Sequence, residues 1–171
     1  MRLFVAIDFP EQGKMELWYL AQRLEYQADR ARVVPMENYH LTLLFIGETN
    51  RINEARAAFH KVPLPEMPIE VKFDGIGSFK QQRDYAWWVG VKTSDALKTL
   101  AADLTAAFRA EGFTIQTRSF KPHITLARRV NSKRLIELSA PPIVLKADRI
   151  SLMSSVNEKG RMVYTEIDCL P

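Results

Sequence analysis

Residues 39–46, Tyr-His-Leu-Thr-Leu-Leu-Phe-Ile, decide the fold of this chain, because their central pattern occurs twice. The tetrapeptide His-Leu-Thr-Leu at 40–43 returns as His-Ile-Thr-Leu at 123–126. Each copy follows a polar or proline-containing turn, at 35–38 and at 119–122. Short apolar runs bounded in this way are typical of β-strands. One copy in each half of the chain indicates two related halves rather than a short-period repeat array.

Strand geometry gives the two motifs a meaning. Side chains alternate between the faces of a strand, so His40 and Thr42 share one face, as do His123 and Thr125. The intervening apolar residues point the other way and can enter a core. Each motif therefore presents an imidazole beside a hydroxyl on a rigid strand. If the halves pack about a pseudo-twofold axis, the two pairs can face each other across a cleft.

The rest of the chain predicts strands and helices in mixed order. Apolar periodicity and turn residues predict strands over 2–9, 31–34, 39–46, 69–79, 85–92, 123–129, 143–156 and 162–168. They predict helices over 11–28, after a cap at Asn50, after a cap at 93–95, and over a short segment near 132–139. This order argues against a doubly wound parallel sheet. We expect an α+β fold of two pseudo-symmetric lobes, each an antiparallel-rich sheet with helices outside, in one bilobal domain over 1–171.

Composition excludes several classes of protein. Of 171 residues, 47% are hydrophobic and 26% are charged, as in an ordinary globular protein. Without a long apolar run or signal peptide, we expect a cytoplasmic protein with no membrane association. Cys169 is the single cysteine and has no partner for a disulfide or a zinc site. The net charge of +4 permits an anionic partner such as nucleic acid but does not require one.

The two motifs suit acid–base chemistry at phosphorus. An in-line displacement needs a base for the attacking oxygen and an acid for the leaving oxygen, and histidine can take either role near neutral pH. The hydroxyls of Thr42 and Thr125 can hold the non-bridging phosphate oxygens. Nothing in this scheme requires a metal or a cofactor. His60, the third histidine, has no threonine two residues after it, and we expect it on the surface.

Three longer segments carry a resemblance to a known family. They are Arg-Leu-Phe-Val-Ala-Ile at 2–7, Pro-Met-Glu-Asn-Tyr-His-Leu-Thr-Leu at 35–43 with Phe45 and Gly47-Glu48, and Phe-Lys-Pro-His-Ile-Thr-Leu-Ala-Arg at 120–128. With these segments the chain resembles the 2H phosphoesterase superfamily. Within it, the chain is similar to the RNA 2′,3′-cyclic phosphodiesterases, also called 2′-5′ RNA ligases. The resemblance covers essentially the whole chain.

The resemblance implies a fold and an activity. It implies a central cleft that holds the four motif residues, and hydrolysis of a terminal RNA 2′,3′-cyclic phosphate to a 2′-phosphate. By the same resemblance His40 is the proton donor to the 3′ oxygen and His123 is the base that activates water. The reverse reaction would give a 2′-5′ linkage. The substrate would be an RNA end or nucleotide with a cyclic phosphate, and we expect a monomer.

Substrate-binding residues also follow from the resemblance. Phe45 and Arg128 each lie five residues after a motif histidine, at positions that flank the terminal base in the family. Strict alternation places both on the face opposite the histidines, so they can serve only if each strand twists or bulges. Arg129 lies six residues after His123, so strict alternation places it on the same face as His123. It is the alternative ligand for phosphate.

Other features around the second motif are less specific. Of the adjacent Trp87 and Trp88, we expect one in the core and the other able to line the cleft. Exposed basic residues can attract an RNA backbone or simply form a solvated rim. These residues are Arg118, Lys121, Arg128, Arg129, Lys133 and Arg134.

Three other functions stay open on the sequence alone. The same chemistry can act on a small cyclic nucleotide instead of RNA, or the cleft can bind RNA without catalysis. A histidine-based metal site is the third alternative, but two motif histidines without a carboxylate partner lack the usual three or four ligands.

Overall fold

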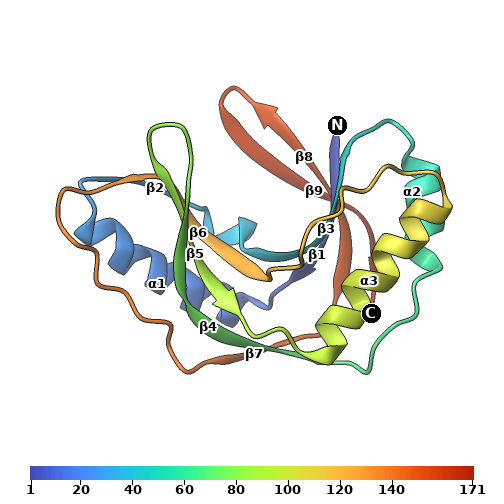
Figure 1. Cartoon of the computed structure of the whole chain (residues 1–171), viewed down its shortest axis with the longest axis horizontal. Coiled ribbons are helices and arrows are strands. Elements are labelled where there is room, and N and C mark those ends of the chain that lie inside the picture. The colour runs from blue at the N-terminus through green and yellow to red at the C-terminus, as the bar shows by residue number, and fades with distance from the viewer.

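A computed structural model describes all 171 residues, which form two antiparallel sheets and three α-helices (Figure 1). The first sheet has the order β3-β1-β8-β9, and the second has the order β2-β6-β5-β4-β7. The strands of the first sheet are β1 (Arg2–Asp8), β3 (His40–Glu48), β8 (Ile150–Glu158) and β9 (Arg161–Leu170). Those of the second are β2 (Arg30–Val33), β4 (Ile69–Lys80), β5 (Tyr85–Val91), β6 (His123–Asn131) and β7 (Val144–Ala147). The helices are α1 (Glu11–Gln27), α2 (Ile52–His60) and α3 (Asp95–Ala110), and a 3₁₀ turn, η1, spans Met36–Asn38.

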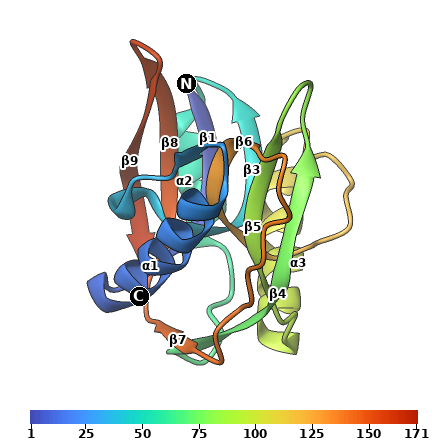
Figure 2. The ribbon, with the colours of Figure 1, turned by 90° about the vertical axis from the view of Figure 1, so that its left-hand side faces the viewer.

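The two halves repeat one unit and exchange their helices. β1, α1 and β3 form an antiparallel pair of strands with a helix between them in sequence, and β5, α3 and β6 form the same unit in the second sheet. However, α1 contacts β2 and β6 of the second sheet, whereas α3 contacts β3 of the first. Figures 1 and 2 show α1 on the side of the second sheet, with α2 and α3 together on the opposite side of the molecule. The predicted pseudo-symmetric α+β architecture is confirmed.

The helices bury the apolar stripes that the sequence predicts. In α1 the buried positions include Leu17, Leu20 and Leu24, three to four residues apart. In α3 the hydroxyl of Ser94 accepts a hydrogen bond from the backbone N–H of Leu97 at 3.2 Å, which is an N-cap. Each leucine that is fully buried contributes about 1.5–3 kcal/mol relative to an exposed side chain. These contacts hold α1 and α3 each against a sheet.

The structure corrects two predicted features of the helices. Residues 132–139 form neither a helix nor a strand, and Ile136 and Leu138 pack on the core at alternate positions. The side-chain amide of Gln27 replaces a strand neighbour here, because it donates to the carbonyl of Glu137 at 2.8 Å and accepts from its N–H at 2.7 Å. The second correction concerns α2, which begins at Ile52 without the side-chain cap expected from Asn50.

None of the three helices combines the length and the apolar character that crossing a bilayer would demand.

Candidate active site

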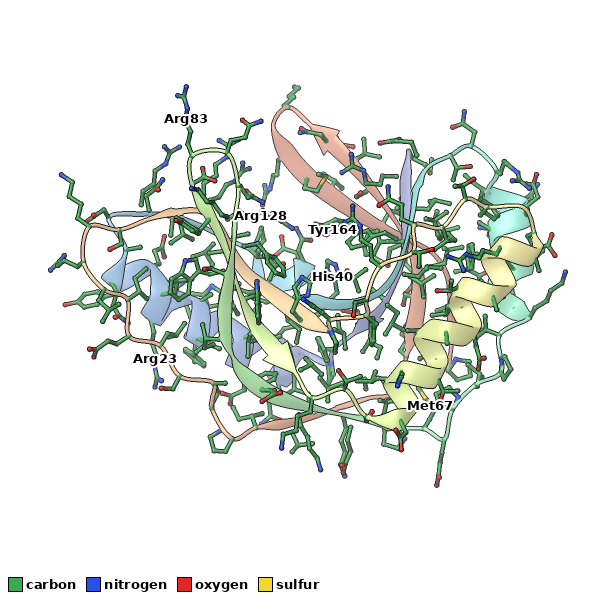
Figure 3. All side chains as sticks on the ribbon, viewed as in Figure 1. Arg23, His40, Met67, Arg83, Arg128 and Tyr164 are labelled. Atoms are coloured by element: carbon green, nitrogen blue, oxygen red, sulfur yellow. The ribbon has the colours of Figure 1, made fainter.

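The two motifs meet where the sheets meet. β3 is an edge strand of the first sheet, β6 belongs to the second, and the two strands contact each other. In both strands the histidine and the threonine are half-buried, and the apolar residues between them are fully or nearly fully buried. Figure 3 shows His40 pointing into the space between the two sheets. The alternation expected from the sequence therefore holds within each tetrapeptide.

Both motif histidines make the same backbone hydrogen bond. Nδ1 of His40 lies 2.7 Å from the carbonyl oxygen of Asn38, and Nδ1 of His123 lies 2.7 Å from that of Lys121. A carbonyl can only accept, so Nδ1 of each ring carries the proton. This fixes the tautomer and leaves Nε2 of each neutral imidazole with a lone pair. Nε2 is thus the atom that can take or give a proton in the cleft.

Each histidine is also bracketed by two aromatic rings from other strands of its own sheet. The ring centroids of Phe4 and Tyr164 lie 5.0 Å and 5.3 Å from that of His40. Those of Phe79 and Trp88 lie 5.2 Å and 5.6 Å from that of His123. Trp88 is the tryptophan that lines the cleft, whereas Trp87 packs against the core from the other face of β5. The packing restrains both imidazoles, so each presents Nε2 in one orientation.

Trp88 can lie flat only because β4 has a glycine beneath it. A Cβ atom built on Gly77 would stand 2.2 Å from the nearest indole carbon, well inside contact distance. The indole therefore covers the bare backbone of Gly77 and supports the ring of His123. Its Nε1–H is buried without a hydrogen-bond partner.

A bulge in β3 places Phe45 on the same face as His40. The pairing of β1 with β3 shifts by one residue at Leu43, so Leu43 and Leu44 are consecutive buried residues. Phe45 follows on the cleft side, with 65% of its surface exposed and its ring centroid 6.4 Å from that of Phe4. Strict alternation therefore fails at Phe45, and the bulge meets the condition under which Phe45 can serve in the cleft.

The second motif strand has a bulge at the equivalent position. The pairing of β5 with β6 shifts by one residue at Leu126, and both Leu126 and Ala127 are buried. Arg128 therefore returns to the cleft side, where Figure 3 shows it near His40. The parity argument for Arg129 fails for the same reason, and Arg129 has a left-handed backbone with φ of 52°.

The electrostatics of His40 combine opposing effects. Burial has the largest effect and lowers the pKa of His40 below its ordinary value. The hydrogen bond to the Asn38 carbonyl and the charge of Asp8 raise this pKa, while the charges of Arg128 and Lys14 lower it. Nζ of Lys14 lies 2.7 Å from a carboxylate oxygen of Asp8 and so offsets much of its effect. The net result favours the neutral imidazole in the free protein.

His60 and the basic residues around the second motif are exposed. His60 is exposed on α2 and lies 2.9 Å from a carboxylate oxygen of Asp168. No group of three or more His, Cys, Asp and Glu side chains is placed to hold a metal ion. The six basic residues around the second motif are all exposed. They are Arg118, Lys121, Arg128, Arg129, Lys133 and Arg134.

Sequence reasoning missed three of the four rings that bracket the histidines. Phe4, Phe79 and Tyr164 lie far from either motif along the chain. Their places depend on the register of strand pairing, which no local pattern in the sequence encodes. The pair Gly77 and Trp88 was the one available signal, because a glycine inside a strand often marks the close approach of another group.

Comparison with known proteins gives the family. Residues 14–159 match the 2′-5′ RNA ligase superfamily. The chain belongs to this family. It is 33% identical over 174 aligned positions to the RNA 2′,3′-cyclic phosphodiesterase of Thermotoga maritima, covering 96% of this chain and 91% of the relative. The protein of the same name from Escherichia coli is 26% identical, over 97% of this chain and 93% of its own length.

Solved structures agree with this assignment. TT0787 of Thermus thermophilus superposes with a TM-score of 0.84 at 26% identity, over 99% of this chain and 96% of that one. The complex of Escherichia coli LigT with 3′-AMP gives a TM-score of 0.79 at 26% identity, with the same coverage of both chains. The family resemblance stated from the motifs and the predicted fold class are both confirmed.

Proposed function

We propose that this protein is a hydrolase that opens terminal 2′,3′-cyclic phosphates of RNA to 2′-phosphates. The observation that carries the proposal is the pair of motif histidines on contacting strands of opposite sheets, each with Nδ1 bound to a carbonyl and Nε2 available. Relatives over nearly the full length of the chain are named RNA 2′,3′-cyclic phosphodiesterases, which supports the same substrate class.

The reaction is a single in-line displacement. Nε2 of His123 takes a proton from water as its oxygen attacks phosphorus opposite the 3′ oxygen. The bond from phosphorus to the 3′ oxygen breaks, and Nε2 of His40 protonates that oxygen. The products are a 3′-hydroxyl and a 2′-phosphate monoester. The hydroxyls of Thr42 and Thr125 donate hydrogen bonds to the non-bridging oxygens, where negative charge accumulates.

The local electrostatics support the assignment of His40 as the acid. A histidine with a lowered pKa is a stronger acid when protonated, and a bound phosphodiester anion offsets the desolvation that opposes its protonated form. Arg128 provides a second positive charge close to His40 for the same anion. Phe45, exposed on the cleft side of β3, offers a ring to the terminal base. Arg129 is a further candidate ligand for phosphate.

Several finer points belong to the same proposal. The protein acts as one bilobal domain and as a monomer in the cytoplasm, without a metal or cofactor. Run in reverse, with the 5′-hydroxyl of another RNA as the nucleophile, the same groups would form a 2′-5′ linkage. A small cyclic nucleotide is the second candidate substrate, because the pair of histidines contacts only the cyclic phosphate itself.

The test combines the two histidine variants with a modified leaving group. An RNA that ends in a 2′,3′-cyclic phosphate is hydrolysed, and the product is identified as a 2′-phosphate. His40→Ala and His123→Ala should each lower kcat by about 10²–10⁴-fold, whereas His60→Ala should not. When sulfur replaces the bridging 3′ oxygen, the leaving group needs no proton. This substrate should restore the turnover of His40→Ala but not that of His123→Ala.

Three outcomes would contradict the proposal. A 3′-phosphate product would reverse the geometry of attack, and unchanged turnover by His40→Ala would remove the acid–base mechanism. Loss of wild-type activity in excess chelator would show that the reaction depends on a metal.

A further inference from the structure

The β4–β5 hairpin is an exposed feature that the proposed chemistry does not use. It projects on the same side of the molecule as the β8–β9 hairpin (Figure 1), and in the view of Figure 2 β1 and β3 lie between the two hairpins. Two residues before the turn at 81–84, the ring of Phe79 contacts both His123 and Trp88, with centroid distances of 5.2 Å to each. Only the tip of the hairpin, residues 80–85, therefore extends beyond the contact of Phe79 with His123.

Two aromatic and two cationic side chains lie near the tip of this hairpin. Phe79 and Tyr85 remain 43% and 40% exposed, although both are large hydrophobic residues. Lys80 follows Phe79, and Arg83 occupies the tip, where Figure 3 shows its side chain extended away from the protein. Neither Lys80 nor Arg83 forms an ion pair. The hairpin therefore offers exposed rings and two cations outside any ion pair, with Asp84 as the one acidic residue of the tip.

This combination matches the chemistry of single-stranded nucleic acid. Bases stack on exposed aromatic rings without regard to sequence, and cations beside the rings follow the phosphate backbone. A folded protein partner would instead favour a wider apolar patch with few charges at its centre. The position also favours RNA, because a strand whose last phosphate lies between the two histidines must continue past one lobe or the other.

We propose that the β4–β5 hairpin is a second subsite, which binds the RNA chain that precedes the terminal cyclic phosphate. Phe79 stacks on the base of the preceding nucleotide, and Lys80 and Arg83 neutralise the backbone phosphates upstream of it. This inference rests on the proposed function and narrows its substrate. It makes the enzyme selective for RNA ends over cyclic mononucleotides.

The test measures selectivity for chain length. Values of kcat/KM are compared for adenosine 2′,3′-cyclic phosphate and for a five-nucleotide RNA with the same terminal group. The selectivity ratio is the second value divided by the first. In the wild type we expect a ratio of at least about 10, since one stacked base alone is worth about 5–150-fold. Phe79→Leu, which keeps an apolar contact for Trp88, should lower the ratio by on the order of 10-fold.

The charged residues are tested with a matched control. The double variant Lys80→Gln/Arg83→Gln should lower the ratio, and it should flatten the salt dependence of the oligonucleotide reaction by roughly 0.7 in log–log slope for each phosphate that is no longer neutralised. Arg23→Gln changes an exposed arginine on α1, remote from the hairpin in Figure 3, and should alter neither quantity.

The outcomes separate this inference from the proposed function. Failure of the wild type to hydrolyse either substrate would refute the proposed function itself. Hydrolysis of both substrates with a ratio near one would leave that function intact and overturn the subsite. An elevated ratio that neither hairpin variant lowers would also overturn it, because the upstream RNA would then bind elsewhere.

Discussion

Gly77→Ala should disable the catalytic site through Trp88 alone, although it adds only one methyl group. The new Cβ would stand 2.2 Å from the nearest indole carbon, whereas ordinary contact begins at 3.4 Å, so the ring must retreat by at least 1.2 Å. The atoms that it meets belong to a rigid ring and cannot rotate away singly. His123 packs against that ring with a centroid distance of 5.6 Å, so it must move with the indole or lose its support.

The size of the effect follows from this displacement. A misplacement of about 1 Å at a catalytic group can lower turnover by about 10²-fold, and we expect a fall of that order in kcat. Overpacking of this kind costs about 1–3 kcal/mol of stability. For a chain of this length, each kcal/mol lowers Tm by roughly 2–4 °C. The variant should therefore remain folded at 25 °C while it loses most of its activity.

The assay is steady-state hydrolysis of the cyclic-phosphate RNA, with thermal unfolding followed on the same samples. Ser78→Ala is the matched control, because Ser78 is the next residue of β4, pairs with Trp87 and is exposed. The double variant Gly77→Ala/Trp88→Phe should recover part of the lost kcat, since the smaller ring leaves space for the methyl group. Full activity of Gly77→Ala, or a double variant no better than the single one, would refute the reasoning.

Three further predictions concern titration and stability. Arg128→Met should raise the pKa of His40 in a histidine NMR titration, because the charge of Arg128 lowers that pKa. Arg129→Met should leave the pKa of His40 unchanged. The opposite pair of results would place Arg129, not Arg128, in the cleft. Because the pKa of His40 is lowered in the folded state, His40 binds more protons in the unfolded state as the pH falls below the ordinary value of 6.5. The wild type should therefore lose unfolding free energy between pH 8 and pH 5.5 in urea titrations, and His40→Asn should reduce that loss. An identical loss in both proteins would contradict this. Tyr39→Phe removes a buried hydroxyl that has no hydrogen-bond partner, so Tm should stay level or rise, and a fall of several degrees would reveal a partner for that hydroxyl.

The sequence predicted the centre of the site better than its borders. His40 with Thr42 and His123 with Thr125 follow from alternation over three residues, a distance at which a strand cannot depart far from its ideal form. Phe45 lies only three residues beyond Thr42, yet its face was predicted wrongly by strict alternation. A bulge reverses the parity of all later residues, and tertiary pairing, not local sequence, determines where it occurs.

The segment over 132–139 shows the same limit for a helix. Leu135, Ile136 and Leu138 suit a short amphipathic turn, but that pattern is too brief to exclude an extended chain. The side chain of Gln27 provides the backbone of this segment with both hydrogen bonds of a strand neighbour. A helix over this segment would lose these two hydrogen bonds. Nothing near 132–139 in the sequence indicates a partner 110 residues away.

The exchange of helices between the sheets bears on how such a protein arose. Because α1 contacts β6 and α3 contacts β3, each helix packs in part against a strand from the other half of the chain. Two identical half-chains could form the same contacts as a domain-swapped dimer with an isologous interface, in which the helix of each chain packs against a strand of the other. Joining two such genes end to end would preserve every contact. His40 and His123 would then descend from one ancestral residue that faced its own copy across a twofold axis, and the separate acid and base roles proposed for them would be a later specialisation.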